Sequence, residues 1–294
     1  MLEAVPNVSE GRDARVIAAI GEAFESHATL LDVHADRDHH RSVFTLVADE
    51  MEIVDALVAG IARAVELVDL RLHEGVHPRV GVADVVPLVP LEPADMARAV
   101  GRARVLAERL GDELDLPVFL YGDAGSDLRP AYFRRGGLVE LTRRVEAGEL
   151  VPDAGPARID PRSGVALVGA RAPLIAYNLV LDTDDLDLAR DTAATVRGSS
   201  GGLPGLQAIG LRLPETGRVQ VSMNVIDLEA APLHLVVERV RAEATARGVE
   251  VAAGELVGLV PERVVRAAEA AGVELPGIDE SRILESALRS RLAE

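Results

Sequence analysis

Twelve consecutive residues carry the densest group of side chains in this sequence that could do acid–base chemistry. The stretch His73-Glu74-Gly75-Val76-His77-Pro78-Arg79-Val80-Gly81-Val82-Ala83-Asp84 contains two histidines, two carboxylates and an arginine, together with two glycines and a proline. The apolar run 85–91 follows it. This pattern predicts a shaped loop that leads into a buried strand, and loops held on a rigid scaffold often carry function.

The segment from His73 to His77 also matches the H-E-x-x-H motif of zinc proteases. That motif works on a helix, where both imidazoles can reach one metal ion. Gly75 weakens a helix, and Pro78 disfavours helical geometry at His77. Residues 68–72 alternate with the period of a strand, so they do not predict a preceding helix. We therefore interpret the zinc motif as a chance match and expect no metal site.

Two interpretations of the loop remain. It is either a turn with surface histidines or a catalytic loop in which His77 transfers protons. Histidine is the side chain whose ordinary pKa lies nearest neutrality. Because Gly75 and Pro78 would hold His77 in place, we favour the catalytic loop.

The composition excludes several kinds of chemistry. The chain has 294 residues, no Cys, and 31 basic residues that are all Arg. Thiol nucleophiles, disulfides, lysine Schiff bases and a phosphate-loop lysine are therefore ruled out. The formal charge of -17 argues against a nucleic-acid surface. The sequence shows no signal peptide and no apolar run near the length of a membrane span, so we expect a cytoplasmic protein.

The hydrophobic periodicity of the first half predicts strands and helices in alternation. A strand at 2–8, a helix at 13–26 and two strands at 29–33 and 42–47 come first, followed by a helix at 51–68 and a strand at 84–89. Further elements are expected at 93–114 (helix), 117–121 (strand) and 136–148 (helix). The order strand-helix-strand-strand-helix-strand is that of a ferredoxin-like unit.

Residues 150–164 contain three prolines and cannot form regular structure. They could be a linker between domains, or a segment that lines a site between domains, where pockets are often found. Two arginines and the flexible glycines favour the second interpretation.

The same order of elements recurs in the second half. Strands are expected at 173–182, 205–213, 219–226 and 249–257, and helices at 184–196, with Asp184 near its start as a cap, and at 233–247. Two helices, at 261–271 and 279–292, close the chain. The predicted fold class is therefore α+β, with two ferredoxin-like α/β-sandwich subdomains at residues 1–170 and 171–294.

Motifs along nearly the whole chain resemble the formiminotransferase family, which includes glutamate formimidoyltransferases and the transferase half of formiminotransferase-cyclodeaminase. The resemblance rests on the shared order of segments 5–12, 31–33, 41–45, 75–85, 117–122, 152–156, 169–171, 199–202, 221–224 and 256–261. It implies transfer of a formimino group from N-formimino-L-glutamate to tetrahydrofolate, in histidine degradation and one-carbon metabolism. It also implies folate bound between two ferredoxin-like subdomains, a homodimer, and a separate cyclodeaminase downstream.

The resemblance assigns roles to individual residues. The catalytic histidine of the family falls on His77, as general acid and base. The folate-binding segment falls on Gly155, Pro156, Ala157, Arg158, Ile159, Asp160, Pro161, Arg162, Ser163 and Gly164. Substrate-binding or supporting roles are expected for Asn7, Asp32, His34, Arg41, Arg79 and Asp84.

The substrates carry carboxylates, which the forked guanidinium group recognises well. Candidates are Arg41, Arg79, Arg158, Arg162 and Arg171, and Arg41 and Arg79 are favoured because they lie beside family motifs. An ordinary surface arginine is the alternative for each of them.

Three positions depart from the family pattern. His34 stands where Asp is usual, His40 where Asn is usual, and Gln207 where bacterial relatives have Lys. These departures leave open a related transferase with another formimino or formyl donor, and a folate-binding homologue without turnover.

Overall fold

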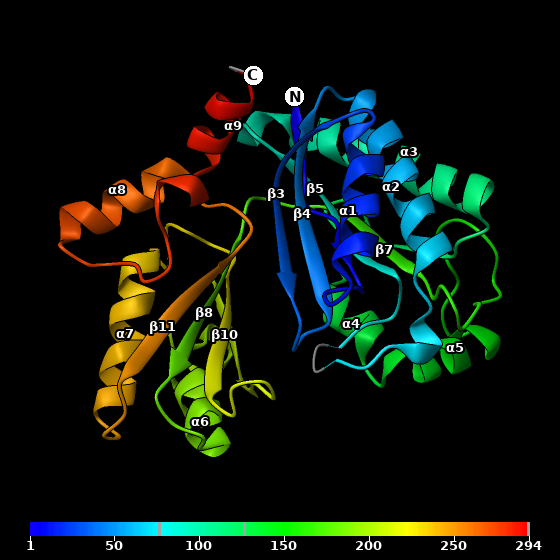
Figure 1. Cartoon of the computed structure of the whole chain (residues 1–294). Helices are drawn as coiled ribbons and strands as arrows, with labels where there is room; N and C mark the ends of the chain where they lie inside the picture. Colours follow the sequence, from blue (N-terminus) through cyan, green and yellow to red (C-terminus); the bar gives the residue numbers. More distant parts are fainter. Residues whose placement is uncertain (76–77, 126–127, 293–294) are drawn as a thin grey trace. The chain divides into compact units, whose positions relative to one another are not determined.

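The computed structural model describes residues 1–75, 78–125 and 128–292, and the chain divides into two compact units. Unit 1 comprises Met1–Ala172 and unit 2 comprises Pro173–Glu294. Each unit combines one β-sheet with helices (Figure 1). The predicted α+β class with two subdomains is confirmed.

Unit 1 is built on a seven-stranded sheet. Its elements are β1 (Leu2–Ala4), β2 (Asn7–Val8), α1 (Ala14–Glu25), β3 (Thr29–Asp36), β4 (Arg41–Ala48), α2 (Glu52–Leu67), the 3-10 helices η1 (Leu70–Leu72) and η2 (Pro93–Asp95), β5 (Ala83–Pro90), α3 (Met96–Leu114), β6 (Val118–Gly122), α4 (Pro130–Arg134), α5 (Gly137–Glu146) and β7 (Ala166–Ala170). The strand order is β1-β4-β2-β5-β7-β6, with β3 on the outer side of β4. β7 runs parallel to β5 and β6, whereas the other pairs are antiparallel.

The first predicted strand is interrupted at Pro6. β1 and β2 both pair with β4 and β5, so together they occupy one position in the sheet. Proline has no N–H to donate, and it breaks a ladder inside a sheet. Val5 N still donates to Pro87 O at 3.1 Å, and Pro6 O accepts from Phe44 N at 3.0 Å. The break leaves Asn7 at the start of a new short strand.

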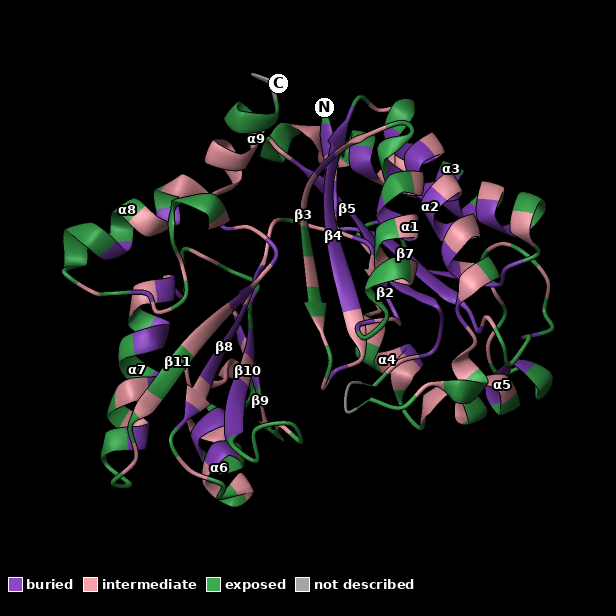
Figure 2. Cartoon of the chain, viewed as in Figure 1, coloured by how far each residue is buried: buried purple, intermediate pink, exposed green. Residues whose placement is uncertain are grey.

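Helices α1, α2 and α3 cover one face of this sheet (Figures 1 and 2). Asp13 caps α1 by accepting from the backbone N–H groups of Arg15 and Val16. The core beneath the helices contains fully buried Phe24, Phe44 and Leu57. Burying each such side chain contributes about 1.5–3 kcal/mol. This apolar layer makes the sheet a rigid platform for its other face.

The opposite face changes character from one side of the sheet to the other. Val85, Leu167 and Phe119 lie side by side on β5, β7 and β6, in an apolar cluster that includes residues of α4 and α5. The same cross-strand row continues in the other direction through Asn7, Val43 and His34. Directly opposed residues point to the same face, so the row passes from an apolar half to a polar half.

Other features of unit 1 also differ from the sequence prediction. The strand β7 and the short helix α4 were not expected. Residues 70–72, expected to alternate as in a strand, form the 3-10 helix η1, in which Asp69 accepts from Arg71 N. The proline-rich segment 150–164 has no helix or strand, as predicted, but both its ends lie in unit 1, so the linker interpretation is wrong.

Unit 2 has a four-stranded antiparallel sheet with the order β11-β8-β10-β9. Its elements are β8 (Ile175–Leu181), α6 (Leu186–Val196), the 3-10 helices η3 (Gly198–Ser200) and η4 (Glu280–Arg282), β9 (Leu206–Arg212), β10 (Val219–Val225), α7 (Leu233–Thr245), β11 (Val251–Val257), α8 (Glu262–Ala271) and α9 (Leu284–Leu292). The cap of α6 is Asp185, which accepts from Asp187 N and Leu188 N, and not Asp184 as predicted. Asp185 is extended backbone immediately before the helix, which is the geometry that a cap requires.

The core of unit 2 lies between this sheet and the helices α6 and α7. Tyr177, Val221 and Val236 are fully buried in it. Among the described helices of both units, none is long and apolar enough to cross a membrane.

Candidate active site

Asn7, Arg41 and Asp84 come together at the start of three neighbouring strands of unit 1. Arg41 donates from Nε and Nη2 to Asn7 Oδ1 at 2.9 and 2.5 Å, and from Nη1 to Asp84 Oδ2 at 3.4 Å. Asn7 Nδ2 in turn donates to Val5 O at 2.7 Å, which fixes its amide. All three residues were predicted from the sequence, although 77 positions separate the first from the last. Strand pairing of β2 with β4 and β5 is what brings them into contact.

Asp84 is the carboxylate at the centre of this group. Its side chain is 2% exposed, and Oδ1 accepts from the backbone N–H of Val80 at 2.8 Å. Oδ2 is shared between Arg41 and Arg134, a residue of α4 whose guanidinium forms a close ion pair with it. Arg134 was missed by sequence reasoning, because nothing local distinguishes it from Arg135 beside it. Two largely buried arginines thus converge on one buried carboxylate.

The electrostatics of the cluster favour an additional anion. Burial, and then the neighbouring Arg134, lower the pKa of Arg41 to about 9, against the opposing influence of Asp84. Burial lowers the pKa of Arg79 to about 10, and Arg134 contributes in the same direction. Both values lie above neutrality, so both groups stay charged while poorly solvated. A bound carboxylate would relieve this cost.

Tyr121 of β6 belongs to the same electrostatic group. Burial raises the pKa of Tyr121 to about 12, although Arg171, Arg134 and Arg41 act in the opposite direction. Its phenol is therefore neutral at physiological pH.

A second set of contacts holds Arg79 beside the turn between β3 and β4. Arg79 Nη1 donates to the ring of His73 in a close contact, and Nη2 donates to His39 O at 3.2 Å. His39 is buried and its Nδ1 lies 2.5 Å from Asp36 Oδ2. Burial alone would raise the pKa of Asp36, but the hydrogen bonds from His39 outweigh it and lower the pKa. Arg79 is thus anchored at a fixed position near Asp84.

His77, the predicted catalytic residue, lies outside the described residues, as does Val76. The residues before them can be compared with the zinc-protease motif. His73 follows the last residue of η1 and has extended backbone, with φ -88° and ψ 127°. The helix that the motif requires is therefore absent at its first ligand position. Within residues 1–75, 78–125 and 128–292, no three His, Cys, Asp or Glu side chains are grouped so that they could hold a metal ion.

Asp32 and His34 lie on β3, opposite Thr45 and Val43 of β4. They are two residues apart, so they share one face of the sheet, and His34 lies in the same cross-strand row as Asn7. Both are partly buried. The sheet thus presents Asn7, Asp32, His34 and Arg41 on one face.

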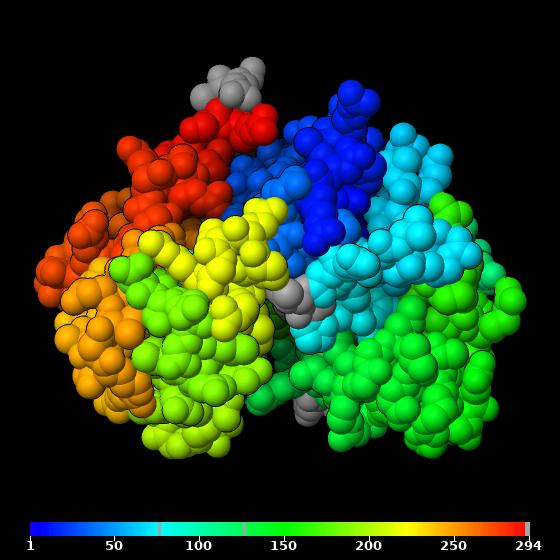
Figure 3. Space-filling model, turned by 60° about the horizontal axis from the view of Figure 1, so that its bottom comes forward, coloured from blue at the N-terminus to red at the C-terminus, as the bar shows by residue number. Residues whose placement is uncertain are grey.

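The predicted folate-binding segment lies against the loop before β5. Gly81 and Gly164 form an antiparallel bridge, Val82 N donates to Ser163 O at 2.8 Å, and Leu70 N donates to Arg162 O at 2.9 Å. Figure 3 shows the corresponding cyan and green segments side by side on the surface of unit 1. A Cβ on Gly81 would lie 1.7 Å from Val165 O, so this approach requires glycine. Two segments, bridged at Gly81 and Gly164, 83 positions apart in the sequence, are therefore joined directly beside Asp84.

Three of the predicted arginines do not join the cluster. Arg158 is exposed. Arg162 donates from Nη2 to Glu66 O at 2.7 Å, which supports the turn that contains it. Arg171 donates from Nη1 to Ala172 O at 3.0 Å and reaches the cluster through Tyr121, whose pKa it lowers. Gln207, in unit 2, pairs with Asn224 across β9 and β10.

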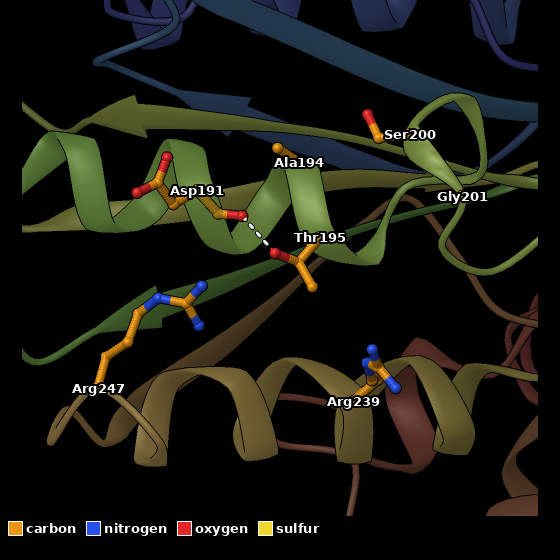
Figure 4. A pocket seen from close by; sticks show the side chains of 7 residues that line it. All are labelled: Asp191, Ala194, Thr195, Ser200, Gly201, Arg239 and Arg247. Carbon is orange, nitrogen blue, oxygen red and sulfur yellow. Dashed lines mark hydrogen bonds between the residues drawn. The ribbon is translucent and has the colours of Figure 1, made fainter.

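Unit 2 has a hollow of its own, between α6 and α7, with a volume of about 500 Å³ (Figure 4). It is lined by Asp191, Ala194, Thr195, Ser200, Gly201, Arg239 and Arg247. Arg239 and Arg247 both pair with Glu243, at 3.3 and 2.9 Å, and Thr195 Oγ1 donates to Asp191 O at 2.9 Å. Because two acidic side chains accompany the two arginines, this hollow lacks the excess of buried positive charge found in unit 1.

Comparison with known proteins agrees with the division of the chain. The N-terminal subdomain of the formiminotransferase domain matches residues 1–171, and the formiminotransferase domain matches residues 176–274. The chain belongs to the formiminotransferase family. Two similar proteins are the glutamate formimidoyltransferases of Thermoplasma acidophilum and Streptococcus pyogenes serotype M1. Each is 38% identical, over 97% and 90% of this chain and 96% and 90% of their own lengths.

The formimidoyltransferase-cyclodeaminase of Gallus gallus is 39% identical over 90% of this chain but only 51% of its own length. The family assignment from the sequence motifs is thus confirmed. Enzymes of this family are transferases, and the same holds for this chain.

Proposed function

We propose that the chain transfers the formimino group of N-formimino-L-glutamate to tetrahydrofolate, giving 5-formiminotetrahydrofolate and L-glutamate. The proposal rests on the family and on one structural observation. This is the cluster of Arg41, Arg79 and Arg134 around the buried carboxylate of Asp84. Both substrates carry carboxylates, and an acidic protein needs such a local concentration of guanidinium groups to bind them.

The cluster would bind a glutamyl carboxylate through the guanidinium groups of Arg41 and Arg134. Asp84 holds the two guanidiniums in place, and Asn7 fixes Arg41 from the other side. This arrangement fixes the orientation of the cations before substrate arrives, so less entropy is lost on binding. Positioning two substrates in this way supplies a large part of the acceleration of a bimolecular transfer.

The folate would lie along Gly155–Gly164. The bridge between Gly164 and Gly81 supports this proposal, because it sets the segment directly beside the loop that leads to Asp84. The two glycines let backbone approach closely, and the exposed Pro161 and Arg162 leave one side of the turn accessible. We assign tetrahydrofolate as co-substrate, and the reaction uses no metal ion.

The chemistry requires one proton to leave and another to arrive. The N5 nitrogen of tetrahydrofolate attacks the amidine carbon and forms a tetrahedral intermediate. The attacking nitrogen loses a proton, the bond from carbon to the glutamate nitrogen breaks, and that nitrogen gains a proton. We assign both transfers to His77 as general base and then general acid, a role worth about 100- to 10,000-fold in rate.

A transfer assay tests the proposal. The purified chain is incubated with N-formimino-L-glutamate and tetrahydrofolate, and acid treatment converts the product to a methenyl derivative that is detected by its absorbance. N-formyl-L-glutamate serves as the competing donor. Product with the formimino donor supports the proposal, and product with the formyl donor alone would redirect it to a related transferase. No product with either donor, with folate still bound, would indicate a binding protein without turnover.

A further inference from the structure

We infer that His40 is a positioning residue. Its positively charged ring connects Glu10 to the loop carrying Glu74 and Gly75, and we call this connection the His40 strut. His40 lies at the end of the turn between β3 and β4, next to Arg41. Its ring connects two segments that are far apart in the sequence. The inference rests on the proposed function only where it concerns turnover, because the strut itself is a matter of protonation and contact.

Both ring nitrogens of His40 face acceptors. Nδ1 lies 2.8 Å from the backbone oxygen Glu74 O, and Nε2 lies 3.2 Å from Glu10 Oε1. A carbonyl oxygen can only accept, so Nδ1 must carry a hydrogen. Glu10 Oε1 already accepts from the backbone N–H groups of Arg12 and Asp13, at 2.7 and 3.0 Å, so it also acts as an acceptor toward Nε2. A histidine that donates from both nitrogens is an imidazolium ion.

The ring of His73 has the opposite hydrogen-bond pattern. His73 Nε2 lies 2.8 Å from His40 O and must donate to it, whereas Nδ1 faces the guanidinium of Arg79 and must accept. His73 is therefore neutral. Its ring stacks on that of His40, with centroids 3.9 Å apart and an angle of 24° between the planes. A charged and a neutral ring can stack in this way without the repulsion of two imidazolium ions.

The backbone around His40 lies in close contact with the loop at Gly75. His40 has φ +48°, in the left-handed region that few residues other than Gly, Asn and Asp adopt. A Cβ on Gly75 would lie 2.5 Å from His39 O and 2.8 Å from the Cβ of His40. The turn and the loop are thus in direct contact at Gly75, one residue before the undescribed pair 76–77. Because His40 fixes Glu74 and Gly75, it also fixes the residues that directly precede the segment carrying His77.

The charged groups around the strut come from three segments. Glu10, from the loop after β2, faces Nε2, and both side chains are largely buried, at 14% and 12% exposed. Arg79 contacts the far side of the neutral His73 ring. Asp36 and His39 form their own pair within the same turn. Glu10 is the charged group in direct contact with the imidazolium, so its removal is the most direct way to disturb the strut.

Two conservative variants separate charge from shape. His40→Asn keeps a residue that tolerates positive φ but cannot become a cation. Glu10→Gln keeps an oxygen acceptor for Arg12 N and Asp13 N but removes the negative charge. His27→Asn, at an exposed position after α1, is the matched control. In each protein the ring ¹⁵N shifts of the histidines are measured at neutral pH, together with kcat and KM for transfer.

In the unaltered chain the two ¹⁵N shifts of His40 should nearly coincide, as in an imidazolium ion, and in Glu10→Gln they should separate as in a neutral ring. His40→Asn should lower kcat by about tenfold with KM little changed, the size expected for losing one charge-assisted hydrogen bond.

Widely separated ¹⁵N shifts for His40 at neutral pH, unaltered by Glu10→Gln, would overturn the inference. So would a loss of kcat in His40→Asn with no loss in Glu10→Gln, which would indicate that the shape of His40 matters and its charge does not. If the unaltered chain transferred no formimino group, the proposed function would fail, and the ¹⁵N shifts would still decide whether His40 is the strut.

Discussion

Each unit contains a carboxylate held between two arginines, and the two groups differ mainly in burial. In unit 1, Asp84 is 2% exposed and pairs with Arg41 and Arg134, at 14% and 15%. In unit 2, Glu243 is 20% exposed and pairs with Arg239 and Arg247, at 52% and 32%. Water solvates the second group and screens it, so its pairs contribute little. The first group is removed from water, so its arginines interact strongly with Asp84 and with an anion that binds beside them.

The comparison shows that counting charged residues does not locate a site. Both groups contain one carboxylate and two arginines, and the group in unit 2 lies beside a hollow of about 500 Å³. The burial of the arginines in unit 1, seen in the lowered pKa values of Arg41 and Arg79, is the property that distinguishes a binding cluster from a surface ion pair.

The largest effect should come from the proton-transfer residue. His77→Ala should lower kcat by about 100- to 10,000-fold, because general acid–base assistance is lost. The control is His234→Ala, at a partly exposed position of α7, which should leave kcat unchanged. Steady-state transfer assays compare the two. Full activity in His77→Ala would show that the catalytic assignment is wrong.

The two carboxylates provide the next test. Asp84→Asn should lower the free energy of unfolding by about 3–5 kcal/mol, because it leaves two buried guanidiniums without their shared anion. Glu243→Gln should change it by no more than about 1 kcal/mol. Urea denaturation measures both. Equal losses in the two variants would contradict the distinction between the groups.

One added atom, the Cβ of an alanine at position 81, should disturb the contact between the proposed folate segment and the loop before β5. Gly81→Ala places a Cβ against Val165 O and should destabilise the chain by about 1–3 kcal/mol. Gly101→Ala, inside α3 with no atom within 4 Å of the new Cβ, should stabilise it by about 0.5–1 kcal/mol. Thermal denaturation distinguishes the signs. A neutral result at Gly81 would mean that the two segments are not held together.

A smaller effect is expected at the pair of Asp36 and His39. The pKa of Asp36 is lowered in the folded state, so its stabilisation is present above the ordinary value of 3.8 and is lost as the pH falls through the lower folded value. Asp36→Asn should therefore cost about 1–1.5 kcal/mol at neutral pH, and less as the solution is acidified past that point. Urea denaturation at a series of pH values tests this. A loss that does not diminish in acid would exclude the ion pair as its cause.

Local patterns in the sequence predicted most of the elements, because helix periodicity and capping depend on neighbouring residues. The helix expected at 13–26 is an example, since α1 spans Ala14–Glu25. Contacts that depend on distant residues were harder to foresee. β7 is a short parallel strand, Ala166–Ala170, and its formation depends on pairing with β5 and β6 on either side. The cap at Asp185 was missed by one position, since two adjacent aspartates offer the same side chain.

The residues of the candidate site divide in the same way, into those that sequence motifs predict and those that depend on distant contacts. Asn7, Arg41, Asp84 and Arg79 could be predicted because they belong to family motifs, and the structure brings the first three into direct contact. Arg134 could not be predicted, since its role depends on α4 packing beside β5, more than 40 residues away in the sequence. Arg162, a candidate for binding a carboxylate, donates to Glu66 O and lies outside the cluster. Only the folded chain shows which arginines are buried together.

The central claim is that the buried cluster of unit 1, and not the hollow of unit 2, binds the glutamyl carboxylate. Calorimetric titration of N-formimino-L-glutamate into the unaltered chain, Arg134→Gln and Arg239→Gln tests it most directly. The Kd should rise by about 10- to 100-fold in Arg134→Gln, as expected for losing one buried charge-assisted contact, and should stay within about twofold in Arg239→Gln. An unchanged Kd in Arg134→Gln, or a large rise in Arg239→Gln, would contradict it.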